Sequence, residues 1–279
     1  MKYPELNKLR AIKDDSSIEE IIQAFKDIKS FYCNFPTVPE KSYLFRTRLG
    51  DKKLEPKDSS ELSYNPNKEY VGIGRANPKK YPVFYGCTHP YFSREEQTTA
   101  INLALREGSG IFRTPKLVNE YEIGCFSRWT TTKPLRCIAF FNHDYGENAN
   151  ELILKYKEDF RKDIFENSPL PERDWEIHKI IASYFAKEFN ENDPNKYRLS
   201  SFLSKNYFEK GFDGIIFPSV IGNAKGMNIA IKYSAADSLK LDYVAQIVNV
   251  KKNGLFSTIY VKQAKNIKEN IIEHWENAK

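Results

Sequence analysis

The sequence contains, at residues 211–219, the stretch GFDGIIFPS, and seven residues later it resumes as GMNIAI. Both stretches are short apolar runs between glycine, proline and asparagine, a pattern typical of buried strands that end in turns. They predict strands at 214–217 and 227–233, joined by a tight turn that contains glycine. Ser219 and Asn228 flank this turn, so the sequence offers two polar side chains at that point.

Runs of the same kind recur along the chain and predict further strands at 43–47, 83–86, 137–141, 245–250 and 258–261. Apolar residues at helical spacing predict helices at 93–106, 151–165, 176–189 and about 267–275. The strands follow one another too irregularly for a repeating strand–helix–strand unit. The predicted class is therefore α+β rather than doubly wound α/β.

The beginning of the chain has a different character from the rest. Ser17 precedes an apolar stripe at helical spacing and Glu20 follows three residues later, which is the pattern of a capping box. Residues 51–68 are polar, contain two prolines and predict a loop. No internal repeat and no linker between two cores is evident. We expect a helical leader at 1–40 and one domain at 41–279, with a helical insertion at about 144–200.

Composition excludes several classes of protein. The chain has 279 residues, of which 41% are apolar, and a net charge of +6, a mild excess that argues against a dedicated nucleic-acid binder. The four cysteines form no C-x-x-C pair and there are four histidines, so we expect reduced thiols and no zinc site. No run reaches the roughly 18 apolar residues of a membrane span. Because residues 1–14 are charged and lack an apolar core, we expect no secretory signal, and the reduced thiols predict a cytoplasmic protein.

Familiar catalytic motifs are missing from the sequence. There is no P-loop, no G-x-S-x-G elbow and no H-E-x-x-H, and the glycines at 72 and 74 lack the third glycine of a dinucleotide fingerprint. His178 lies on a helical pattern, where a packed or surface histidine is expected more often than a catalyst. The chemistry must therefore come from a less familiar set of residues.

Two arginines are candidates for binding an anion. Arg46 alternates with apolar neighbours on a predicted strand, and a guanidinium half-buried in a sheet needs an acidic partner or a bound anion. Arg75 follows a glycine and could hold a phosphate with two hydrogen bonds. Pairing with a carboxylate of the protein is the alternative for Arg46.

Tyr85 and Glu96 complete the candidate set. Tyr85 could stack on a planar heterocycle, or it could be a core aromatic residue. Glu96 begins a predicted helix and could bind a ribose or stabilise a cationic transition state. Since Glu96 stands three residues after Ser93, it could instead serve only as the reciprocal member of a capping box.

Taken together, these stretches resemble the RES-domain family, which is named for its Arg, Glu and Ser. The family has an early arginine on a strand, a Gly-Arg-x-Asn turn, a tyrosine about ten residues later and a glutamate about eleven residues after that. Here Arg75, Tyr85 and Glu96 have these spacings. A Gly-Phe-Asp-Gly-Ile strand that runs into Pro-Ser, and a later strand led by asparagine, complete the resemblance, which covers about 42–250.

The resemblance implies a fold, a substrate and a partner. RES proteins are toxins of bacterial toxin–antitoxin pairs, usually beside an Xre-type antitoxin. They consume NAD by hydrolysis or phosphorolysis, and some are reported as ADP-ribosyltransferases. Their core is similar to the ADP-ribosyltransferase fold, with two packed β-sheets and peripheral helices. We therefore expect an NAD glycohydrolase or phosphorylase, with NAD as substrate, no separate cofactor and no metal.

The resemblance also implies a role for each candidate residue. Glu96 would stabilise the oxocarbenium-like transition state, and Glu95 and Glu107 are rival carboxylates. Arg75 and Tyr85 would also take part in catalysis. The expected contacts with NAD come from Arg46, Arg75, Tyr85, Ser219 and Asn228.

Two alternatives stay open from the sequence. One is an ADP-ribosyltransferase that modifies a protein. The other is a non-catalytic module that binds a nucleotide or RNA. The sequence does not determine whether water, phosphate or a protein is the acceptor.

Overall fold

The computed structural model describes residues 3–13, 15–28, 30–33, 35–50, 55–89, 92, 97–114, 119–141, 151–187, 193, 195, 197–220 and 226–278. Within these ranges the chain forms eight α-helices, two short 3-10 helices and ten strands. The strands are β1 (Thr37–Val38), β2 (Tyr43–Leu49), β3 (Val83–Thr88), β4 (Asn119–Thr131), β5 (Leu135–Ala139), β6 (Gly214–Pro218), β7 (Met227–Lys232), β8 (Leu239–Lys252), β9 (Leu255–Lys268) and β10 (Ile271–Asn277). The α-helices are α1 (Glu5–Arg10), α2 (Ile18–Lys26), α3 (Thr98–Glu107), α4 (Gly110–Arg113), α5 (Glu151–Asn167), α6 (Pro171–Ala186), α7 (Arg198–Glu209) and α8 (Tyr233–Ala236).

The ten strands form one mixed sheet in the order β1-β5-β6-β7-β3-β2-β4-β8-β9-β10. Neighbouring strands are antiparallel except β5 and β6, which are parallel. In the middle of the sheet, β2 and β3 meet at a single residue pair, Phe45 opposite Cys87. This narrow junction divides the sheet into two parts, β1-β5-β6-β7-β3 and β2-β4-β8-β9-β10.

The mixed α and β class predicted from the sequence is confirmed. The expected pair of packed sheets is not what the structure has, because the junction between β2 and β3 makes the two halves parts of one sheet. Apolar runs locate strands, but which edges hydrogen-bond to one another depends on contacts far apart in the sequence. The likeness to the ADP-ribosyltransferase core stays a prediction.

The helix predicted at about 267–275 is wrong, because this segment is an antiparallel hairpin of β9 and β10. Its turn is formed by Glu269 and Asn270, which both have positive φ angles of 48° and 67°. Apolar residues four apart, such as Ile267 and Ile271, therefore lie on two paired strands rather than on one helix face. Strand β4 and helix α7 were not predicted, because charged and polar residues interrupt their apolar patterns.

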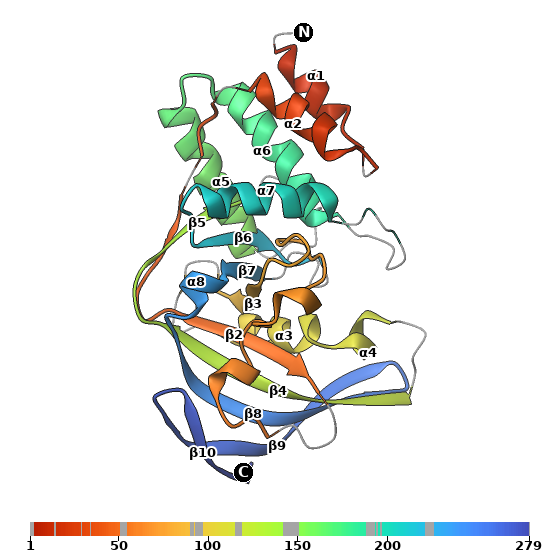
Figure 1. Ribbon diagram of the computed structural model, residues 1–279, viewed down its shortest axis with the longest axis vertical. Helices are drawn as coiled ribbons and strands as arrows, with labels where there is room; N and C mark the ends of the chain where they lie inside the picture. Colours follow the sequence, from red (N-terminus) through yellow and green to blue (C-terminus); the bar gives the residue numbers. More distant parts are fainter. Residues whose placement is uncertain are drawn as a thin grey trace.

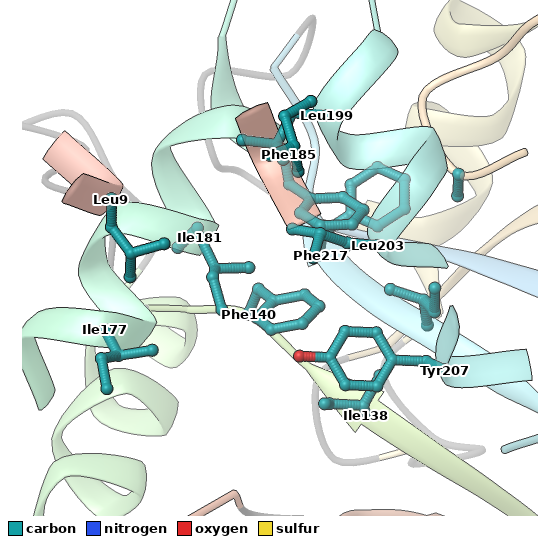
Figure 2. Packing of buried hydrophobic residues seen from close by; sticks show 14 of the residues in the cluster. Leu9, Ile138, Phe140, Ile177, Ile181, Phe185, Leu199, Leu203, Tyr207 and Phe217 are labelled. Atoms are coloured by element: carbon teal, nitrogen blue, oxygen red, sulfur yellow. The ribbon is translucent and has the colours of Figure 1, made fainter. Parts of the chain in front are cut away.

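Helices α1, α2, α5, α6 and α7 gather at one end of the molecule, and the β8–β10 strands lie at the other end (Figure 1). The predicted capping box is confirmed, since Ser17 and Glu20 hydrogen-bond reciprocally at the start of α2. Leu9 of α1 packs in the same core as Ile177 and Ile181 of α6 and Phe140, which follows β5 (Figure 2). The leader thus shares a core with the helices of 151–209, and the proposed domain limits stay a prediction.

Candidate active site

A cavity of about 240 Å³ opens where β2 and β3 separate on either side of their single paired residues. Its walls come from β2, β3, β7 and the end of α3. The lining residues are Phe45, Arg46, Thr47, Tyr85, Gly86, Cys87, Ala104, Glu107, Gly108 and Asn228. Strands that part in this way leave backbone polar groups without ladder partners, so the cavity is suited to a polar ligand.

Arg46 bridges the gap between the two parted strands. Its guanidinium Nη1 donates to the backbone carbonyl of Tyr85 at 2.6 Å and lies over the Phe84 ring at 5.2 Å from the ring centre. Burial, assisted by the neighbouring charge of Arg48, lowers the pKa of Arg46 to about 10, so the side chain remains cationic at neutral pH. No carboxylate of the described residues forms an ion pair with Arg46, and its buried Nε has no hydrogen-bond partner there. Among the described residues the wall therefore holds a cation without an ion-pair partner, which favours an anionic ligand.

Glu107 is the carboxylate of the cavity. Its Oε1 accepts hydrogen bonds from Ser219 Oγ at 2.5 Å and from Asn228 Nδ2 at 2.8 Å. Glu107 is the last residue of α3, where the helix dipole disfavours a negative charge. The two donors offset this cost and fix one oxygen, while Oε2 has no hydrogen-bond partner in the described part of the chain.

The backbone brings these residues together by close packing. The Cα of Gly108 lies so near β2 that a Cβ there would be 2.4 Å from Thr47 Cβ and 2.9 Å from the Thr47 carbonyl oxygen. This contact sets the end of α3, and with it Glu107, against the strand. On the other side, the Ser219 amide donates to the Gly226 carbonyl at 2.9 Å, which holds Ser219 at the end of β6 beside Asn228 on β7.

Tyr85 lines the cavity, but its hydroxyl is engaged elsewhere. The hydroxyl donates to Asn77 Oδ1 at 2.7 Å and accepts from the Ala76 amide at 2.8 Å. It thereby ties β3 to the turn 74–77, in which Gly74 and Asn77 exchange backbone hydrogen bonds. Burial raises the pKa of Tyr85, so the phenol stays protonated.

Arg75 is not among the residues that line the cavity. Its Nη1 donates to the carbonyls of Phe185 and Lys187 at 2.7 and 2.8 Å, at the end of α6. Its guanidinium also lies over the Tyr197 ring at 4.9 Å. A cation is favourable at the carbonyl end of a helix, so these contacts account for Arg75 without a bound phosphate.

Glu96, Glu95 and Ser93 lie outside the described residues, so the expected role of Glu96 and its capping alternative are not addressed by the geometry. Glu107 ranked in the sequence only as a rival carboxylate. The local pattern that points to Glu107 is its position at the end of the apolar helical pattern of α3, directly before Gly108. Its two donors come from strands more than a hundred residues away, and no local pattern announces them.

No family model matches the sequence, and no curated protein matches it. The structure is similar to a chain of the crystal structure of the M. tuberculosis MbcT–MbcA toxin–antitoxin complex. The match covers 75% of this chain and 86% of that chain, with 11% sequence identity and a TM-score of 0.31. A likeness this slight carries no argument about fold or activity.

The described residues contain no group of three or more histidine, cysteine, aspartate or glutamate side chains that could hold a metal ion. None of the helices in these ranges is both long enough and apolar enough to cross a bilayer.

Proposed function

We propose that the chain binds NAD at this cavity and cleaves the bond between nicotinamide and ribose. The observation that carries the proposal is the presence, in one cavity, of a fixed carboxylate, Glu107, and of a cation, Arg46, that has no ion-pair partner among the described residues. A carboxylate suits a ribose that develops positive charge, and a guanidinium suits the phosphates of the same molecule. The resemblance of the sequence to RES-domain proteins supports the same chemistry.

The proposed reaction needs no strong acid. The bond from ribose C1′ to nicotinamide nitrogen breaks, and its electron pair leaves with nicotinamide, which becomes a neutral ring. The ribosyl cation is stabilised by the Glu107 carboxylate. A water molecule forms the new bond to C1′ and loses a proton to Glu107 Oε2; Glu107 then releases this proton to solvent, so the net products are ADP-ribose, nicotinamide and one proton.

Replacement of Glu107 by glutamine tests this proposal. Glutamine keeps an oxygen that can accept from Ser219 and Asn228, but it removes the negative charge. The rate of nicotinamide release from NAD is measured by chromatography in a reaction without added metal. It should fall roughly a hundredfold to a thousandfold, the usual loss for one preorganised electrostatic contact.

Two controls make the test specific. Glu122→Gln changes a half-buried carboxylate outside the cavity, which accepts hydrogen bonds from the Ser109 hydroxyl and the Ile111 amide. This variant should keep nearly full activity. Glu96→Gln tests the rival assignment, and a dead Glu96→Gln beside an active Glu107→Gln would place the catalytic carboxylate at position 96. No nicotinamide release from NAD by the parent chain with water, phosphate or protein as acceptor would overturn the proposal.

The proposed biological setting is that of a toxin held in check by a partner protein, as the RES resemblance implies an Xre-type antitoxin. Expression in bacteria should arrest growth while cellular NAD falls, and Glu107→Gln should abolish both effects. Growth arrest with unchanged NAD would favour transfer of ADP-ribose to a protein, which labelled NAD and mass spectrometry would detect.

A further inference from the structure

Cys87 is connected to the carboxylate of the cavity through a single side chain. Its Sγ donates to Asn228 Oδ1 at 3.3 Å, and Asn228 Nδ2 donates to Glu107 Oε1 at 2.8 Å. Cys87 on β3 and Asn228 on β7 are directly opposite in the antiparallel register, so the sheet itself holds the two side chains together. Cys87 is only 3% exposed, although it forms part of the cavity wall.

The direction of these hydrogen bonds follows from the chemistry of the three groups. A carboxylate only accepts, so Asn228 must turn its NH₂ group toward Glu107. Its carbonyl then faces the thiol, which is the donor. If the amide rotated by 180°, its carbonyl would face the carboxylate and its NH₂ group would face the sulfur. The carboxylate thus sets the amide orientation, and the thiol, which donates to the carbonyl on the other side of the amide, reinforces it.

The thiol keeps its proton at neutral pH. Burial raises the pKa of Cys87 well above its ordinary value, and the negative charge of Glu107 raises it further against the opposing effect of Arg46. The donor is thus present at neutral pH. A thiolate at this place would lose the hydrogen bond to Asn228.

We propose that Cys87 is a positioning residue, which locks the Asn228 amide so that its NH₂ group holds Glu107 Oε1 in place. This inference rests on the proposed function, since it assigns Cys87 a part in the same cleavage reaction. Cys87 touches neither the ribose nor the leaving group in this scheme. Its effect reaches the reaction only through Asn228 and Glu107.

Serine and alanine at position 87 separate this role from packing. Serine retains a donor for Asn228 Oδ1, whereas alanine removes it. We expect Cys87→Ala to lower kcat for nicotinamide release about tenfold with KM changed less than about twofold, and Cys87→Ser to stay within about threefold of the parent. The matched pair Cys137→Ala and Cys137→Ser changes a buried cysteine of β5 outside the cavity and should leave kcat unaltered. Equal kcat values for Cys87→Ala and the parent, or equal losses in alanine and serine variants, would overturn the proposal.

Nuclear magnetic resonance detects the immobilised Asn228 amide without measuring catalysis. The side-chain NH₂ signals of Asn228, assigned by their loss in Asn228→Asp, should exchange slowly with solvent in the parent and in Cys87→Ser. In Cys87→Ala they should exchange at least about tenfold faster, because the amide has lost the contact that holds its carbonyl. This result would stand even if NAD proved not to be the substrate, whereas equal protection in all three proteins would refute the positioning role itself.

Discussion

Arg46 and Arg75 are both half-buried arginines, but their surroundings give them different tasks. Arg46 has one carbonyl partner and lines the cavity with unused donor capacity. The guanidinium of Arg75 donates to two carbonyls at the end of α6 and lies over the Tyr197 ring. Residue type and sequence spacing could not separate them, because both follow patterns that suit an anion site.

Methionine at each position should therefore give opposite results. Arg75→Met should lower the free energy of unfolding by about 1.5–3 kcal/mol, the range for hydrogen bonds to a charged group, and leave KM for NAD within about twofold. Arg46→Met should raise KM at least about tenfold, because the anion loses its cation. Urea unfolding and steady-state kinetics on both variants provide the measurement, and a large rise in KM for Arg75→Met would restore Arg75 to the binding site.

At the next scale, the end of α3 is placed by its contact with β2. Gly108 has a φ of −79°, so alanine would suit the local backbone, and only the lack of space beside Thr47 opposes it. Gly108→Ala should force α3 away from the strand, which costs about 1–3 kcal/mol and moves Glu107 from its donors.

The midpoint temperature of thermal unfolding and the rate of nicotinamide release should both be lower in Gly108→Ala than in the parent. Gly72→Ala serves as the matched control, because a Cβ there would meet nothing within 4 Å, and it should leave activity unchanged. Full activity in Gly108→Ala would mean that Glu107 tolerates a displaced helix end, contrary to the mechanism.

The elements that the sequence predicted correctly are those with a local cause. The capping box at Ser17 and the strands that became β3, β6 and β7 each have their signal within a few residues. Strand β4 is bounded on both sides by hydrogen-bonded neighbours, β2 and β8, and this tertiary pairing outweighs its polar residues. At the hairpin of β9 and β10 the sequence pattern instead predicted a helix that is not there. An apolar spacing of four residues occurs both on a helix face and on two strands around a turn.

The candidate site divides in the same way. Arg46, Tyr85 and Asn228 lie on strands with clear local patterns, and the sheet brings all three to one cavity. Ser219 does not line the cavity, but it contacts the cavity residue Glu107 through a hydrogen bond. That partnership joins the end of a helix to a strand end over a hundred residues away, so only the folded chain reveals it.

Across the whole molecule, the N-terminal leader is joined to helix α6 through buried polar contacts of Tyr32. The amide of Tyr32 donates to Asp174 Oδ2 at 2.9 Å, and the Tyr32 carbonyl lies 2.8 Å from His178 Nε2. Because a carbonyl only accepts, Nε2 must carry the proton in this contact. The other ring nitrogen is buried without a hydrogen-bond partner in the described residues, among the rings of Phe31, Phe140 and Phe160.

This arrangement predicts a pH dependence of stability. Burial lowers the pKa of His178 from 6.5 to about 4, against the smaller opposing effects of the Tyr32 carbonyl and Asp174. Between pH 6.5 and pH 4 the unfolded chain binds a proton at His178 that the folded chain does not, so stability falls as pH falls through this window. The loss between pH 7 and pH 4.5 should be about 2 kcal/mol from this residue alone.

Urea unfolding at several pH values isolates the contribution. His178→Gln keeps a donor for the Tyr32 carbonyl but cannot titrate, so its stability should decline less steeply than that of the parent between pH 7 and pH 4.5. His274→Gln changes an exposed histidine on β10 and should retain the parent slope. Parallel slopes for the parent and His178→Gln would mean that His178 binds its proton equally well in the folded and the unfolded chain, so that burial of the ring does not lower its pKa.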